Sequence, residues 1–207
     1  TVFEEKDDLM PFCEAKLYGH NATHALAGYI GALLGVQHIA ELKPIKGIIE
    51  FLRTAFIEES GATLTKRHGG KDTLFTPAGY EAYADDLLER MTNPFLRDSV
   101  ERVTRETERK LGWDDRLVGT MRLALKYGVE PKRYAFGAAA ALAFISRSVI
   151  DDNTLAENLL KNIWKESSPD KREAEKVIHL VEDAMISLKK WKDLHFPNLN
   201  KFLFNRE

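Results

Sequence analysis

Three residues near the start of the chain carry side chains that could together oxidise an alcohol without a metal. Lys16, Asn21 and His24 lie within nine positions, and at ~100° per helical residue their offsets place them within a wedge of roughly 140°. A lysine can take the hydroxyl proton as a hydride leaves the carbon, while an amide and an imidazole hydrogen-bond the developing alkoxide. For that role Lys16 has to be partly neutral at about pH 7 to 8, through burial or neighbouring cations. On spacing alone, a solvated lysine, a helix N-cap and a core histidine are the more common interpretation.

A second group of residues could bind an anion. Arg102, Arg105 and Arg109 recur at spacings of three and four, which predicts three guanidinium groups on one face of a single helix. Such a face suits bidentate binding of a phosphate or a carboxylate, and Lys110 and Arg116 extend the positive cluster. Surface ion pairs with interleaved acids are the alternative interpretation. These acids are Asp98, Glu101, Glu106, Glu108 and Asp115.

The sequence offers little to a metal ion. His20 and His24 are four residues apart, but no carboxylate and histidine pattern completes a ligand set, and the HExxH signature is absent. Cys13 is the only cysteine, which excludes an internal disulfide bond and a cysteine-based zinc site, and we expect it to be a small core residue. Metal-independent chemistry is therefore predicted.

The composition is that of a globular domain without a general affinity for nucleic acids or membranes. The chain has 207 residues, of which 44% are hydrophobic and 30% charged, and its formal net charge is -2. Any anion site therefore has to be a local cluster of lysine and arginine. No apolar run is long enough to span a bilayer, and the first eight residues are acidic where a signal peptide is basic and then apolar. Together with the single cysteine, these features predict a cytoplasmic protein with no nucleic-acid or membrane partner.

The elements that carry these residues are predicted to be helical throughout. Apolar residues recur at helical spacing over residues 21–36, which predicts a buried helix. Pro44 is expected to start a second helix that ends at Gly61, and the turn-forming residues 68–72 mark the clearest break in the chain. Further helices are expected over residues 77–90, 94–109, 114–127 and 136–144.

The character of the sequence changes after residue 150. Residues 151–154 are expected to cap a short helix, and residues 169–170 to start a long charged helix that runs towards Trp191. We therefore predict an all-α, multi-helical chain. It comprises a helical substrate-binding and catalytic domain, residues 1–150, and a helical extension packed on the same domain, residues 151–207. No strand followed by a Gly-rich turn and a helix is recognised, so a dinucleotide-binding domain is not predicted.

Several motifs together resemble the long-chain mannitol dehydrogenase family. The Lys, Asn and His spacing of that family occurs in EAKLYGHNATHA (residues 14–25), followed by YIG (residues 29–31). Segments similar to its mannitol-1-phosphate 5-dehydrogenase branch are IEESGA (57–62), KRHG (66–69), NPFLRDSVERV (93–103), RKL (109–111) and DRL (115–117). The resemblance covers roughly residues 1–145 and is loose over the last sixty.

The resemblance implies a fold and a set of site residues. Members of the family have an N-terminal Rossmann-type NAD domain and a mostly helical C-terminal domain resembling that of 6-phosphogluconate dehydrogenase, with the substrate in the cleft between them. This sequence matches the C-terminal domain. The resemblance implies that Lys16 is the general acid/base and that Asn21 and His24 are its oxyanion partners. The implied substrate contacts are Arg102, Arg105 and Lys110, to which the helical spacing adds Arg109.

The implied reaction is the NAD-linked interconversion of mannitol 1-phosphate and fructose 6-phosphate. NAD is expected to bind mainly to the N-terminal domain, so residues 1–207 are expected to be inactive alone. The expected partners are a sugar-phosphate or polyol substrate and the Rossmann-type domain. Two alternatives stay open. One is a dehydrogenase of an unphosphorylated polyol or a sugar acid, of the mannitol 2-dehydrogenase or hexuronate reductase type, and the other is a non-catalytic helical module that binds an anion or a partner.

Overall fold

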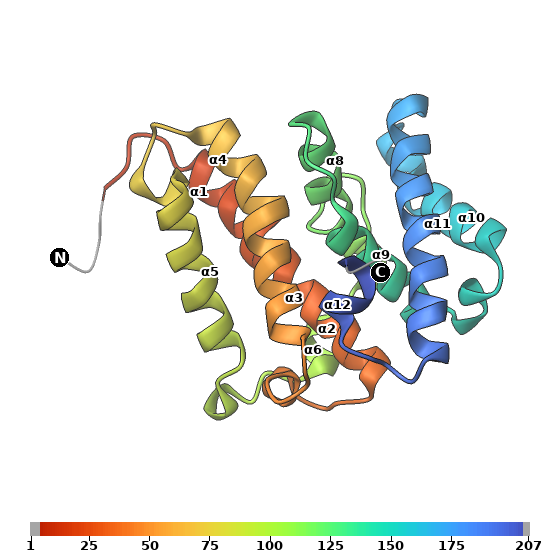
Figure 1. The fold of residues 1–207 in the computed structure, drawn as a ribbon. Helices are drawn as coiled ribbons and strands as arrows, with labels where there is room; N and C mark the ends of the chain where they lie inside the picture. Colours follow the sequence, from red (N-terminus) through yellow and green to blue (C-terminus); the bar gives the residue numbers. More distant parts are fainter. Residues whose placement is uncertain (1–4, 205–207) are drawn as a thin grey trace.

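The computed structural model describes residues 5–204, and all of its regular elements are helices (Figure 1). No strand is formed within this range, although an isolated antiparallel bridge joins His38 to Ser99. The all-α, multi-helical prediction is therefore confirmed. The α-helices are α1 (Met10–Glu14), α2 (Ala22–Leu34), α3 (Ile48–Thr54), α4 (Ala62–His68), α5 (Pro77–Met91), α6 (Val100–Thr104), α7 (Thr107–Lys110), α8 (Val118–Lys126), α9 (Lys132–Ile145), α10 (Asn153–Trp164), α11 (Lys171–Asp193) and α12 (Leu199–Phe204).

Two long rods of consecutive helices lie on the left of Figure 1. In the first rod, the π-helical segment η1 (Ala15–Asn21) joins α1 to α2. The helix expected to start at residue 21 is therefore part of a continuous helical run that starts at Met10. It ends at Gly35, whose φ of 73° lies in the left-handed region that favours glycine. In the second rod, the π-helical segment η3 (Ala55–Gly61) joins α3 to α4. Such segments are rare and frequently occur at functional sites.

The two π-helical segments pack against each other, and η3 also packs against α5. A Cβ on Gly19 would lie 2.5 Å from Tyr80 Oη, and a Cβ on Gly61 would lie 2.6 Å from Tyr80 Cδ1. These glycines therefore make room for the buried Tyr80 ring. The expected helix end at Gly61 is wrong, because this glycine serves close packing and the helix continues to His68. The predicted break over residues 68–72 follows it and is confirmed.

Side-chain caps explain the predicted starts of the two helices after residue 150. The side chains of Asp152 and Asp170 accept hydrogen bonds from backbone N–H groups in the first turns of α10 and α11. Helix α5 also has its predicted bounds to within one residue. The start expected at Pro44 is wrong, since α3 begins only at Ile48, after Gly47 in the left-handed region.

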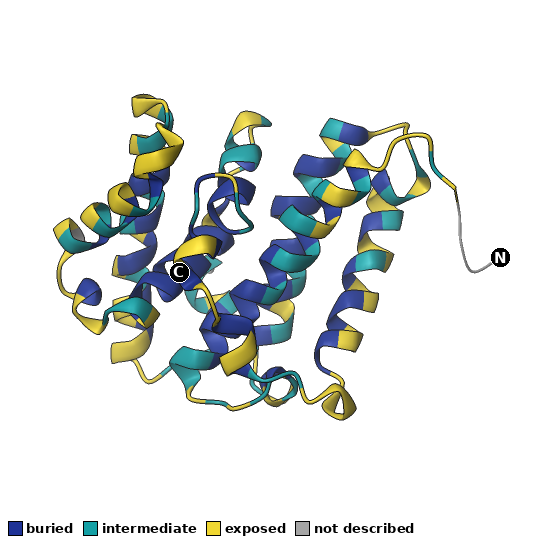
Figure 2. Cartoon of the chain, turned by 180° about the vertical axis from the view of Figure 1, so that it is seen from behind, coloured by how far each residue is buried: buried dark blue, intermediate teal, exposed yellow. Residues whose placement is uncertain are grey.

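The helix α9 is the centre of the core because it is built from small residues. Its run Ala138 to Ala141 has no exposure to solvent, and α2 and α11 both pack against α9. The apolar core continues into α10 and α11 through the buried Trp164 and Trp191. Figure 2 shows buried residues on the facing sides of the helices and exposed residues on their outer faces. Residues before and after position 150 thus share one apolar core.

Two further observations concern the surface of the molecule. Within residues 5–204, no helix combines the length and the apolar character needed to cross a membrane. Cys13 is exposed, so the expectation of a core cysteine is wrong. It lies on α1, where Pro11 is the buried residue.

Candidate active site

Residues from both predicted groups meet at one cavity of about 360 Å³. It lies between α2 and the segment that runs from α6 to the start of α8. Its lining consists of Asn21, His24, Ala25, Arg102, Val103, Arg105, Glu106, Arg109, Lys110 and Arg116. The fold therefore brings together six of the seven residues predicted to act at a site, and Lys16 lies outside this lining.

Lys16 and Asn21 are both carried by the π-helical segment η1. A π-helix bonds residue i to residue i+5, so it winds more residues into each turn than an α-helix. Lys16 and Asn21, five positions apart, are therefore one π-turn apart and closer to a common face than the α-helical wedge predicts. Lys16 is exposed, so this domain does not supply the burial that the sequence interpretation requires of a neutral lysine.

The walls of the cavity approach each other where α2 has a glycine. A Cβ on Gly28 would lie 2.5 Å from Val103 Cγ1 on α6. One turn earlier on α2, His24 Nε2 lies 2.6 Å from Asp98 Oδ2, and Arg102 Nε donates to Asp98 Oδ1 at 2.9 Å. Burial raises the pKa of Asp98, but the hydrogen bonds and charges of His24 and Arg102 outweigh it and hold this pKa below its ordinary value. His24 therefore faces an ionised carboxylate.

The arginines do not share one helix, and the expected helix over residues 94–109 is wrong. Helix α6 begins only at Val100 and ends at Thr104; Glu106 then takes a left-handed conformation, with φ of 53°, before α7. The hydroxyl groups of Thr104 and Thr107 donate to the backbone carbonyls of Val100 and Thr104, at 2.9 and 2.8 Å. Such side-chain bonds to the backbone compete with a continuous helix. The cations consequently reach the cavity from several short elements.

Each of the three arginines pairs with an acid close to it in sequence. Arg102 pairs with Asp98, Arg105 with Glu101 at 3.8 Å, and Arg109 with Glu106 at 2.6 Å. All three arginine side chains are more than half exposed. Glu101 and Glu106 are exposed as well, so the pairs of Arg105 and Arg109 contribute little to stability and can exchange for another anion. The geometry thus contains both the ion pairs and the cation cluster that the sequence analysis set as alternatives.

Lys110 is the buried cation of the cavity, with 5% of its surface exposed. Burial, assisted by the charges of Arg116 and Arg109, lowers the pKa of Lys110 to about 8. The sequence interpretation expects a buried lysine at Lys16, whereas in the structure Lys110 is buried and Lys16 is exposed. At neutral pH the Lys110 ammonium is mostly protonated and offers three N–H donors to an anion.

His20 lies beside the predicted reaction residues. Its Nδ1 is 3.5 Å from Tyr83 Oη, and its ring centroid is 6.4 Å from that of His24. Burial, followed by the charges of His24, Arg90 and Lys16, lowers the pKa of His20 to about 4, so His20 is neutral at physiological pH. Within residues 5–204, no group of three or more His, Cys, Asp or Glu side chains is placed to hold a metal ion.

Two residues at or beside the cavity are not among the seven predicted site residues, although the sequence analysis includes Arg116 in the positive cluster. Arg116 lines the cavity, and its Nε is 2.8 Å from Asp115 Oδ1. Asp98 was considered only as a partner of the arginines, which its i,i+4 spacing to Arg102 indicates. Its contact with His24 joins residues 74 positions apart, and no local signal in the sequence predicts it.

A comparison with family models identifies the domain. The model of the mannitol dehydrogenase C-terminal domain matches residues 8–195. The chain belongs to this family. Mannitol dehydrogenases are oxidoreductases, so the cavity lies in the C-terminal domain of a polyol dehydrogenase family member. The match includes both walls of the cavity and continues through α10 and α11, beyond the roughly 145 residues in which motifs of this family are recognisable by eye.

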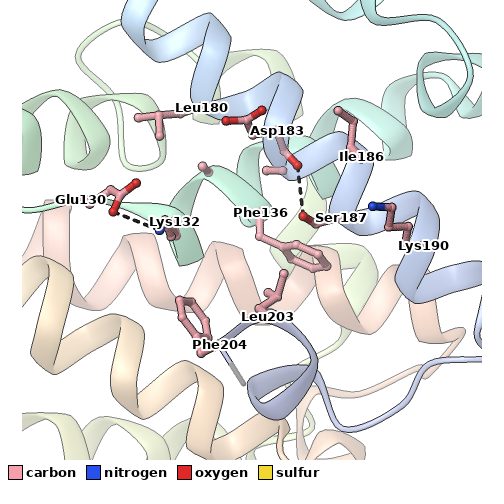
Figure 3. A pocket seen from close by; sticks show the side chains of 12 residues that line it. Glu130, Lys132, Phe136, Leu180, Asp183, Ile186, Ser187, Lys190, Leu203 and Phe204 are labelled. Carbon is pink, nitrogen blue, oxygen red and sulfur yellow. Dashed lines mark hydrogen bonds and ion pairs between the residues drawn. The ribbon is translucent and has the colours of Figure 1, made fainter. Parts of the chain in front are cut away.

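This mannitol dehydrogenase domain has a second cavity, of about 700 Å³, between α9, α11 and α12 (Figure 3). Phe136, Leu203 and Phe204 contribute apolar side chains to it, while Lys132 pairs with Glu130 at 3.1 Å. None of the seven predicted site residues lines this second cavity. The candidate active site is therefore assigned to the first cavity.

Proposed function

We propose that this domain binds the substrate of an NAD-dependent dehydrogenase that interconverts mannitol 1-phosphate and fructose 6-phosphate, with Lys16 as the general acid/base. The observation that supports this most is the joint lining of one cavity by Asn21, His24 and five cations. The amide and the imidazole suit a reacting oxygen, and the cations suit a phosphate ester. A substrate with an alcohol or ketone at one end and a phosphate at the other could contact both sets of residues.

The residues of this chain handle the proton and the oxygen of the reaction. In polyol oxidation, Lys16 Nζ accepts the proton of the reacting hydroxyl while the carbon loses a hydride, so the alcohol becomes a ketone; reduction returns the proton. The Asn21 amide donates to the oxygen that carries the developing negative charge, and His24 hydrogen-bonds the same oxygen. Because Lys16 is exposed, its desolvation depends on the bound substrate and on a second domain that closes over it.

The phosphate is bound by cations that exchange one anion for another. Five cations line the cavity against one carboxylate, that of Glu106, so the cavity is electropositive. Arg105 and Arg109 can leave their exposed pairs with Glu101 and Glu106 for the doubly charged ester. Lys110 is already buried in the cavity wall and adds a positive point charge there.

Residues 5–204 do not form the usual binding site for a dinucleotide. Residues 5–204 contain no strand and hence no Gly-rich turn between a strand and a helix, which is the usual cradle for a dinucleotide pyrophosphate. We propose that NAD is bound mainly by an N-terminal Rossmann-type domain and supplies the hydride acceptor from there. Residues 1–207 alone should then bind the sugar phosphate without turning it over.

The test is the oxidation of NADH by the full-length enzyme with fructose 6-phosphate or with fructose. Arg105→Gln and Arg109→Gln should each raise the KM for fructose 6-phosphate by roughly 10-fold, since each removes a charge-assisted bond, and should leave any activity on fructose unchanged. Arg53→Gln is the matched control, because Arg53 pairs with Asp85 outside the cavity. Turnover of fructose that exceeds turnover of fructose 6-phosphate would favour an unphosphorylated polyol or sugar acid. No turnover of any ketose by the folded protein would favour a non-catalytic binding module.

A further inference from the structure

The proposed reaction leaves one ionised carboxylate beside the active site without a role. The side chain of Asp98 is 11% exposed, and both of its oxygens are engaged. Oδ2 lies 2.6 Å from His24 Nε2, while Oδ1 accepts from Arg102 Nε at 2.9 Å and also contacts Arg102 Nη2. A carboxylate bonded to the imidazole of a site histidine is an arrangement that orients the ring and selects its tautomer.

The backbone holds Asp98 in place independently of His24. Its carbonyl accepts a hydrogen bond from Ile39 N at 2.9 Å, and two residues later Val100 N donates to Gln37 O at 2.9 Å. The next residue, Ser99, caps α6 by accepting from Arg102 N at 3.2 Å. The carboxylate is thus a fixed partner on the opposite wall, against which the His24 ring is set.

This contact decides which ring nitrogen of His24 is available to a ligand. Because Nε2 is bonded to a carboxylate, an acceptor only, the Nε2 nitrogen must carry a proton. Nδ1 is then the nitrogen left for a ligand in the cavity that His24 lines. In the neutral ring Nδ1 can accept a hydrogen bond only from another substrate hydroxyl, because the proton of the reacting hydroxyl goes to Lys16. In its second form, the imidazolium, Nδ1 donates a hydrogen bond to the alkoxide or ketone oxygen. The Asp98 charge supports the second form as negative charge develops on the substrate oxygen.

We propose that Asp98 is a positioning residue for His24, keeping a proton on Nε2 and leaving Nδ1 to bond the reacting oxygen. This inference rests on the proposed function only for its effect on turnover, because the tautomer of His24 is a property of the domain itself. Arg102 is then a bridge, since it touches Asp98 on one side and lines the substrate cavity on the other.

The test combines histidine nitrogen NMR with steady-state kinetics on the full-length enzyme. The His24 resonances, assigned by their loss in His24→Gln, should show a protonated Nε2 and an unprotonated Nδ1 at a pH where the ring is neutral. Asp98→Ala should convert them to a mixture of tautomers. Asp98→Ala should also lower kcat for fructose 6-phosphate by roughly 10–100-fold, the usual effect of losing the carboxylate that orients a functional histidine. The change in KM should be smaller.

Two further variants separate orientation from folding. Asp98→Asn has the same shape and keeps an acceptor for Nε2, so it should retain the tautomer and lose part of kcat through the missing charge. Asp85→Asn makes the same chemical change at a carboxylate that pairs with Arg53 outside the cavity, and should leave both the His24 spectrum and kcat unchanged. An unchanged tautomer in Asp98→Ala, or a changed tautomer with full kcat, would overturn the proposal. Loss of the proposed function would instead show as retained turnover in Lys16→Ala while the NMR signature of Asp98→Ala persisted.

Discussion

The two walls of the active-site cavity are built in opposite ways. One wall is the rod from α1 through η1 to α2, a continuous run of helix. It is tied to the central helix α9 by the buried hydrogen bond between Thr23 and Tyr134, at 2.8 Å. The other wall consists of α6, α7 and the start of α8, with left-handed residues at Arg97 and Glu106 and arginines that are largely exposed.

This difference matches the work proposed for each wall. Proton transfer and oxyanion binding depend on positions held to a fraction of an ångström, which a packed helix provides. Binding a phosphate depends mainly on the sum of charges, so exposed arginines on short elements suffice. Substitutions on the first wall should therefore act on kcat, and substitutions of the arginines on the second wall should act on KM. Asp98 is the exception on the second wall, because it bonds His24 of the first wall.

The largest effect is expected from Lys16→Ala. Removing the proton acceptor should lower kcat by roughly 10²–10⁴-fold with little change in KM, and the free energy of unfolding should stay within about 0.5 kcal/mol because the side chain is exposed. Steady-state kinetics and urea unfolding of the full-length enzyme measure both quantities. Lys43→Ala, at an exposed lysine between the two rods, is the control and should change neither. Retained turnover in Lys16→Ala would contradict the assignment of kcat to the first wall.

The first wall could be predicted largely from the sequence, because its signals are local. The spacing of Lys16, Asn21 and His24 and the helical period that follows them are both written in consecutive residues. The π-helical form of η1 could not be predicted in this way. It occurs where Gly19 packs against Tyr80, a contact between segments far apart in the sequence.

For the second wall, the sequence predicts which residues take part and not their conformation. The three-and-four spacing of the arginines indicates one helix, but threonine hydroxyls bonded to the backbone interrupt it, and Glu106 reverses the sign of φ. The burial of individual side chains could not be predicted from the sequence either. The buried lysine of the cavity is Lys110, whose pKa burial lowers, whereas Lys16 is exposed. Which lysine is buried follows from tertiary packing and not from local spacing.

A second, intermediate effect is expected at Lys110, and it depends on pH. Its pKa in the folded domain, about 8, lies below the ordinary value of 10.5, so between these values the unfolded chain binds more protons and stability rises with pH. Below pH 8 the buried ammonium costs about 1–3 kcal/mol. Lys110→Met should therefore stabilise the domain by about that amount at pH 7, and its advantage should shrink towards pH 10.

The same substitution should weaken substrate binding, since it removes a cation from the cavity lining. Urea unfolding at pH 7 and pH 10, with the KM for fructose 6-phosphate at pH 7, measures both effects. Lys132→Met is the control, because Lys132 is half exposed and paired with Glu130, and it should show neither the pH-dependent gain nor a change in KM. A Lys110→Met domain that is less stable than the wild type at pH 7 would contradict the idea that burial of this charge is costly.

The smallest effect is expected from Glu101→Gln, at the outer edge of the second wall. The pair between Arg105 and Glu101 is long, at 3.8 Å, and exposed on both sides, so its loss should change the free energy of unfolding by less than about 0.5 kcal/mol. Freed from its partner, Arg105 should bind the phosphate slightly better and lower the KM for fructose 6-phosphate by up to about 2-fold. Because the competition is between exposed charges, the gain should vanish at high salt. Asp85→Asn, which frees Arg53 outside the cavity, should leave KM unchanged. A rise in KM in Glu101→Gln would mean that Glu101 holds Arg105 in its binding position, so that the second wall, like the first, works by fixed geometry.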